Sequence, residues 1–142
     1  ESLGKKGKGI MPIVSVAPRD HHSLMQLYLD GPKDKLFYIF SLKFNKKTTI
    51  NKNIFKKNFS HLKYEDISRI KEAQKNSLIK VLKTKNIPFQ EFVIDKKNEE
   101  VIGKLFAYFI TETVLIGKLL GVNPFDQPAI EQIKALTRKH LS

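Results

Sequence analysis

Residues 121–134 carry residue types and a spacing suited to binding a phosphorylated ligand. They read Gly-Val-Asn-Pro-Phe-Asp-Gln-Pro-Ala-Ile-Glu-Gln-Ile-Lys, and Pro128 suits the first position of a helix, where no backbone donor is needed. Either Asp126 or Gln127 can cap this helix with a side-chain oxygen. Gln127 and Lys134 stand seven residues apart, about two helical turns, so we expect both side chains to project to one side.

The beginning of a helix favours an anion, because its first backbone N–H groups have no partner within the helix. A side-chain amide and an ammonium on the same side, Gln127 and Lys134, therefore predict a site for a phosphorylated ligand. A structural interpretation stands beside this one, since most turns of this kind only end one helix and begin the next.

A second group able to do chemistry is Asp20-His21-His22-Ser23. Asp20 stands at the N-cap position of a helix expected over residues 21–30. The helix dipole disfavours an imidazolium in the first turn, which makes a histidine there useful for proton transfer at physiological pH. For His21 a plain surface position is the alternative, and we expect it there.

The Asp-His-His triplet is also similar to the metal-binding triplet of one class of phosphoesterases. That class needs further aspartates after earlier strands, and none precedes Asp20 in this sequence. We therefore expect no metal site. His61 and His140 stand among polar residues and are interpreted as surface residues.

Residues 1–9, Glu-Ser-Leu-Gly-Lys-Lys-Gly-Lys-Gly, hold three glycines and three lysines, a composition typical of a loop. We call this segment the Gly/Lys loop. Its backbone N–H groups could bind phosphate, but it lacks the Gly-Lys-Ser/Thr ending of a nucleotide-binding P-loop. We expect a flexible basic loop and no nucleotide site.

The remaining sequence alternates between strand and helix patterns, which predicts an α/β fold with a parallel sheet and helices on both faces. Ligands of such sheets gather at the carboxyl ends of the strands, where the turn at residues 17–22 would lie. A long polar loop with a short helical piece is expected between the second strand and the second helix. The expected strands are 12–16, 36–42 and 89–95; the expected helices are 21–30, 65–85, 98–120 and one after residue 127; the loop is 43–63.

Composition places the chain among ordinary globular proteins. It has 142 residues, enough for one domain, with 41% hydrophobic and 28% charged residues. Cysteine is absent, which fits a reducing compartment and argues against disulfides and thiolate metal sites. The chain starts at Glu1 without a methionine or an apolar signal segment, so we expect a processed product or, as the favoured interpretation, a piece of a longer protein.

The net charge of +12 raises the possibility of nucleic-acid binding. The positive charges are scattered lysines, with three arginines only, Arg19, Arg69 and Arg138, whereas nucleic-acid recognition usually exploits the planar guanidinium. We expect no nucleic-acid partner. We also expect no membrane span, because Lys104, Glu112 and Lys118 interrupt the apolar segment 98–120.

Three ordered motifs together resemble the glucose-6-phosphate isomerase family. The Gly/Lys loop followed by Asp20-His21-His22-Ser23 is similar to the bacterial pattern Glu-Ser-x-Gly-Lys-x-Gly-Lys-Gly and then Asp-x-His-Ser. Residues 28–33, Ser41 and residues 121–134 continue the resemblance. It covers essentially the whole chain, as the C-terminal third of the family's enzyme.

The resemblance implies a role for four residues in interconverting glucose 6-phosphate and fructose 6-phosphate. Glu1 matches the catalytic base, which moves a proton between C2 and C1 through a cis-enediol. His22 matches a histidine that assists ring opening and reaches the site of the partner subunit. Lys134 matches a lysine that also acts in ring opening, and Gln127 a glutamine near the substrate and its phosphate.

The resemblance also implies a three-layer αβα sandwich of the sugar-isomerase (SIS) type, which is flavodoxin-like, in a cytoplasmic homodimer. A sugar phosphate is the expected partner, and the reaction needs no metal or organic cofactor. Two positions depart from the family: Ala129 stands where glycine is common, and His21 where glutamine or leucine is common. The family's serine- and threonine-rich phosphate loop and an active-site arginine lie upstream of Glu1, so we expect the isolated chain to be inactive or nearly so. The alternative function is a non-catalytic sugar-phosphate-binding module.

Overall fold

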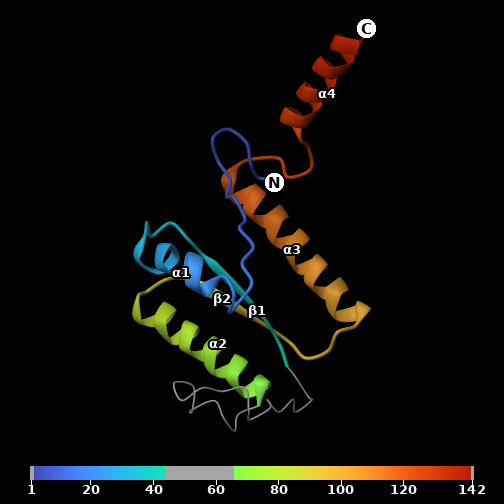
Figure 1. The fold of residues 1–142 in the computed structure, drawn as a ribbon. Helices are drawn as coiled ribbons and strands as arrows, with labels where there is room; N and C mark the ends of the chain where they lie inside the picture. The colour runs from blue at the N-terminus through green and yellow to red at the C-terminus, as the bar shows by residue number, and fades with distance from the viewer. Residues whose placement is uncertain (1, 44–65, 142) are drawn as a thin grey trace. The chain divides into compact units, whose positions relative to one another are not determined.

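Helices and strands alternate along the described parts of the chain, residues 2–43 and 66–141. In this computed structural model they follow in the order α1 (His21–Asp30), β1 (Phe37–Leu42), α2 (Ile67–Thr84), β2 (Phe89–Ile94), α3 (Glu99–Leu120) and α4 (Pro128–Leu141) (Figure 1). They belong to two compact units, one of Val14–Lys97 and one of Glu1–Ile13 with Asn98–Ser142. The loop expected over residues 43–63 lies, apart from Lys43, outside the described residues, as does His61.

A parallel pair of strands forms the sheet of the Val14–Lys97 unit, as predicted. The register runs from Phe37 opposite Phe89 to Leu42 opposite Ile94. Successive side chains of a strand point to opposite faces, so Phe37, Phe89 and Glu91 share one face. Phe40 and Phe92 share the other face, where their rings stack with centroids 4.9 Å apart.

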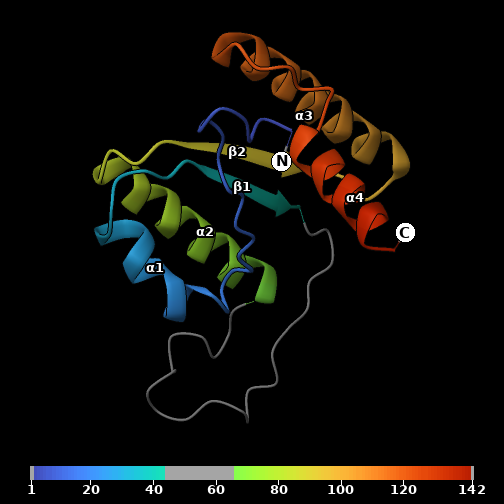
Figure 2. The same ribbon diagram turned by 90° about the horizontal axis from the view of Figure 1, so that it is seen from above.

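Helices α1 and α2 cover the same face of this sheet (Figure 2). Tyr28 of α1 meets Phe37 of β1 edge to face, with ring centroids 5.7 Å apart. Lys75 of α2 forms an ion pair with Glu91 of β2, at 2.8 Å. Leu82 of α2 is fully buried. Tertiary packing of these apolar side chains, more than helix propensity, holds the two helices on the sheet.

The predicted strand at residues 12–16 is wrong. Ile13 and Val14 are 67% and 89% exposed, and no strand in the described ranges pairs with this segment. Apolar, β-branched residues form a strand only where a neighbouring strand supplies hydrogen bonds and packing. The N–H of Val16 instead donates to the carboxylate of Asp20 at 2.7 Å. The described sheet thus has two strands in place of three, and the turn before α1 does not follow a strand end.

Helix α3 begins and ends at the positions that its sequence predicts. The side chain of Asn98 accepts a hydrogen bond from the N–H of Val101 and so caps the first turn. Gly121 follows the last turn in the left-handed conformation, with φ of 66°, which glycine adopts without strain. The N–H of Val122 then donates to the carbonyl of Gly117 at 3.0 Å. Among the described residues, no helix is long and apolar enough to cross a membrane.

Candidate active site

The Gly/Lys loop is closed upon itself by a tight turn. The N–H of Lys8 donates to the carbonyl of Lys5 at 2.9 Å, and the two residues between them, Lys6 and Gly7, have φ of 54° and 70°. A Cβ added to Gly9 would lie 2.8 Å from the Cα of Gly4. The glycines are therefore required by backbone geometry.

Lys5 joins this loop to the turn between α3 and α4. Its ammonium donates to the carbonyls of Ser2, at 2.9 Å, and of Asn123 and Asp126. The same nitrogen lies 2.6 Å from the carboxylate of Asp126, and the Lys5 side chain is 13% exposed. Lys8 adds a second link, from its ammonium to the carbonyl of Leu120 at 2.5 Å. All of these residues belong to one compact unit.

Lys8 donates to a carbonyl group that the end of α3 leaves unpaired. The last four carbonyls of a helix have no partner within it and carry the negative end of the helix dipole. Leu120 is the last residue of α3, and Lys8 satisfies its carbonyl. Positive charge at this position therefore stabilises the end of α3 while fixing the loop to it.

The carboxylate of Asp126 is held in its charged form by these contacts. Its pKa is lowered, first by the hydrogen bond from Lys5 and, against the effect of desolvation, by the positive charge of Lys5 and a hydrogen bond from Asn123. The Asp126 side chain remains 54% exposed. Asp126 and Gln127 were both considered as caps of α4, and the carboxylate of Asp126 is bound to Lys5.

Gln127 begins the hydrogen bonding of α4. Its carbonyl accepts from the N–H groups of Ile130 and Glu131, at 3.0 and 3.2 Å, and Pro128 is the first helical residue, as predicted. Lys134 stands almost two turns further on, with its ammonium 2.7 Å from the carboxylate of Glu131. Both partners of this pair are exposed, so the Lys134 ammonium is accessible to a ligand.

His22 occupies the second position of α1, and its side chain is exposed. Asp20 stands at the N-cap position, but its carboxylate makes no capping hydrogen bond. It is held instead by Arg19, at 2.8 Å, and by the N–H of Val16. These two contacts, that of Arg19 first, lower the pKa of Asp20.

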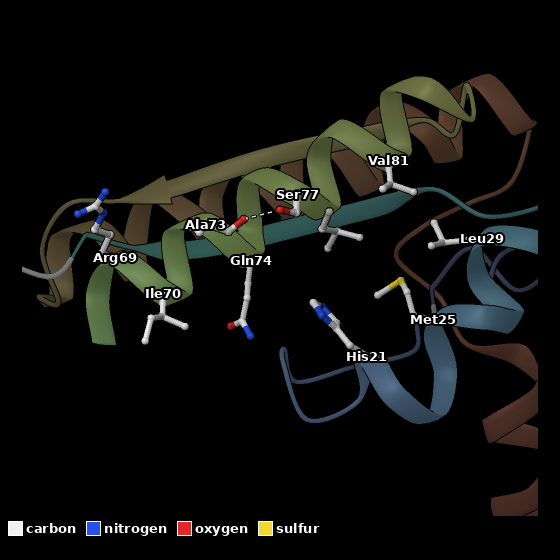
Figure 3. A pocket seen from close by; sticks show the side chains of 10 residues that line it. His21, Met25, Leu29, Arg69, Ile70, Ala73, Gln74, Ser77 and Val81 are labelled. Carbon is white, nitrogen blue, oxygen red and sulfur yellow. Dashed lines mark hydrogen bonds between the residues drawn. The ribbon is translucent and has the colours of Figure 1, made fainter. Parts of the chain in front are cut away.

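The prediction of a surface position for His21 is wrong. Its side chain is half-buried and lines a groove of about 670 Å³ between α1 and α2 (Figure 3). Within the described ranges, its Nε2 atom is buried without a hydrogen-bond partner. Met25 and Ile70 belong to the same lining. His21 therefore lies at the groove between the two helices, whereas the adjacent His22 is exposed.

The structure brings together two of the three sequence motifs. The Gly/Lys loop and residues 121–134 meet through Lys5, whereas His22 belongs to the other compact unit. Glu1 lies outside the described residues. Sequence reasoning missed Lys5 and Asp126 as a pair because 121 residues separate them. In the parts of the chain that the structure describes, no three His, Cys, Asp or Glu side chains are grouped to hold a metal.

The parallel sheet with packed helices, and the basic loop fixed to a helix-opening turn, define the chain as part of an α/β protein with a candidate anion site. No protein-family model matches the chain. It is 36% identical over its whole length to a probable glucose-6-phosphate isomerase of Methanococcus maripaludis, of which the match covers 32%. It is 33% identical over 96% of its length to glucose-6-phosphate isomerase of Methanocaldococcus jannaschii, covering 33% of that protein.

Glucose-6-phosphate isomerase of Campylobacter jejuni is also similar, with 31% identity over the whole chain and 36% of that protein. A crystal structure of a hypothetical protein from Thermus thermophilus superposes with a TM-score of 0.77 at 26% identity, over 89% of this chain and 31% of that one. The chain thus spans about a third of the length of the curated relatives it matches. The predicted resemblance is confirmed: the chain is homologous to a portion of glucose-6-phosphate isomerase.

Proposed function

We propose that this chain is the C-terminal part of an enzyme that interconverts glucose 6-phosphate and fructose 6-phosphate. One observation carries the proposal beyond sequence similarity. Lys5 ties the segment that directly follows Glu1 to the turn that directly precedes Gln127. The segments next to the proposed base and next to Gln127 in the sequence are thus held together by one contact network, which supports the proposal.

The reaction moves one proton between neighbouring carbons of the open-chain sugar. In the direction of the ketose, the Glu1 carboxylate removes the proton from C2; the C–H electrons form the C1–C2 double bond, the C1=O π electrons move to O1, and O1 takes up a proton to give the cis-enediol. The protonated carboxyl then returns its proton to C1 while the O2 hydroxyl loses a proton and C2 becomes the carbonyl carbon, so the proton lost from O2 balances the one gained by O1. Such general base catalysis contributes about 10²- to 10⁴-fold in rate, and hydrogen-bond donors at O1 and O2 stabilise the charge that develops there.

His22 and Lys134 are proposed to act before this step, in opening the sugar ring. Opening needs a donor at the ring oxygen O5 and an acceptor for the proton of the O1 hydroxyl. The exposed position of His22 at the beginning of α1 suits a histidine that reaches into the site of a second subunit. Gln127, at the beginning of α4, suits a donor near the phosphate. On the basis of the resemblance, we propose a cytoplasmic homodimer of SIS type.

The chain by itself is proposed to be inactive or nearly so. Binding energy from the phosphate positions the reacting carbons, and the resemblance places the main phosphate loop upstream of Glu1. A protein extended by this upstream part, called the extended protein below, is therefore the form in which activity is expected.

Variants of the extended protein test the catalytic assignment against the binding-module alternative. Glu1→Gln keeps the size of the side chain but removes the base, so we expect kcat to fall by about 10³-fold in a coupled assay of fructose 6-phosphate conversion. Isothermal titration should show fructose 6-phosphate still bound within a few-fold of the unsubstituted affinity. His22→Ala should also lower kcat, with His140→Ala as a surface control. Unchanged turnover in Glu1→Gln and His22→Ala, with altered binding, would establish the non-catalytic module instead.

A further inference from the structure

The ammonium of Lys5 contacts two segments of the chain, the Gly/Lys loop and the turn between α3 and α4. It contacts the carbonyl of Ser2, the carbonyls of Asn123 and Asp126, and the carboxylate of Asp126 at 2.6 Å. An ammonium has three N–H donors, so four acceptors share them. With 13% of its side chain exposed, Lys5 is held in one place by contacts on several sides, unlike an ordinary surface lysine.

The two ends of this network directly adjoin residues of the proposed site. Ser2 directly follows Glu1 in the sequence. Asp126 precedes Gln127, whose carbonyl begins the hydrogen bonding of α4. A displacement of this turn would therefore move Gln127 and the helix that carries Lys134.

We infer that Lys5 is a positioning residue, which fixes the Gly/Lys loop to the turn before Gln127 and so sets the placement of α4 without touching the substrate. The inference rests on the proposed function and adds to it a residue with a defined role. Misplacement of reacting groups by about 1 Å can cost about 10²-fold in rate. Loss of the Lys5 contacts would also leave the Asp126 carboxylate and three carbonyls to be satisfied by water.

Lys6 provides a matched control within the same turn. It has the same side chain and charge, and its exposed side chain makes no hydrogen bond or ion pair with other described residues. Lys5→Met and Lys6→Met therefore remove the same charge and keep a side chain of similar length. Only the first of the two breaks the link between the Gly/Lys loop and the α3–α4 turn.

The experiment measures kcat, KM and the melting temperature of the extended protein and its variants. For Lys5→Met we expect kcat per folded molecule to fall by about 10²-fold, with KM changed by less than about threefold. Lys6→Met should stay within about twofold in both constants. A Lys5→Met enzyme that melts earlier but keeps its kcat would overturn the inference, because Lys5 would then be only structural.

Asp126→Asn keeps the test decisive if Lys5→Met does not fold. It retains the carbonyl contacts and removes only the charged partner, so we expect folding and a loss of about tenfold in kcat, and an unchanged kcat would contradict the inference. Failure of the proposed function is a separate result: the unsubstituted extended protein would then show no isomerase turnover at all. If that protein is active and both variants match it, only the role of Lys5 is wrong.

Discussion

Pro124 packs against Gly117 so closely that a Cβ added to Gly117 would lie 3.1 Å from the Cβ of Pro124. This contact folds the turn before α4 back onto the last turns of α3. The carbonyls of Asn123 and Asp126 are thereby presented together to Lys5. Gly117 of α3 thus contacts the same turn that Lys5 binds.

The contact predicts different effects of alanine at two glycines of the same helix. Gly103 has no atom within 4 Å of an added Cβ, so Gly103→Ala should stabilise the chain by about 0.5–1 kcal/mol, the usual difference in helix propensity. Gly117→Ala should lose most of this gain, because Pro124 must shift. Urea unfolding with equal m-values provides the comparison, and equal stabilisation by both substitutions would contradict the close contact.

Gly121 is predicted to be sensitive for a different reason. Its φ is 66°, and an added Cβ would meet no atom within 4 Å, so the cost of Gly121→Ala is conformational and not steric. We expect a loss of about 1 kcal/mol in the free energy of unfolding. Gly121→Asn should recover part of it, since asparagine tolerates the left-handed region. Equal stability of the alanine and asparagine variants would show that the backbone does not hold this conformation.

The lowered pKa of Asp126 predicts a loss of the Lys5 contact in acid. A carboxyl whose pKa is depressed in the folded state contributes stability above its ordinary value, 3.8, and this contribution is lost as pH falls through the lower folded value. In an NMR titration, the Asp126 carboxyl carbon should show a midpoint below 3.8. Lys5→Met should raise that midpoint, and identical titrations of the two proteins would exclude the ion pair.

Much of the fold followed from local signals in the sequence. Pro128 predicted the beginning of α4, Asn98 stands before α3 and Gly121 after it, and each lies at the expected boundary. Such boundaries depend on hydrogen bonds made within a few residues, which is why a single sequence reveals them. The strand β1 was equally clear because it lies in an apolar run of ordinary strand length, and β2, although it contains Gln90 and Glu91, is also of ordinary strand length.

The features that were not predicted depend on partners that the sequence pattern does not identify. Residues 12–16 have strand-like composition, but a strand needs a neighbour, and the sequence does not say where one lies. Asp20 stands where a cap belongs, yet the adjacent Arg19 and the N–H of Val16 take its carboxylate. The role of Lys5 depends on a turn 121 residues away, and no periodicity relates the two. The proposed site was thus recognised from its motifs, whereas the contact that joins two of them needed the structure.

A coupled assay of fructose 6-phosphate conversion, run on this chain and on the extended protein at equal concentrations, is the decisive test of the proposed isomerase activity. The proposed function predicts rapid conversion by the extended protein and little or none by the 142-residue chain, because the resemblance implies a phosphate loop upstream of Glu1 whose binding energy positions the substrate. Full activity of the chain alone would show that the upstream part is dispensable. No activity in either protein would contradict the assignment as an isomerase.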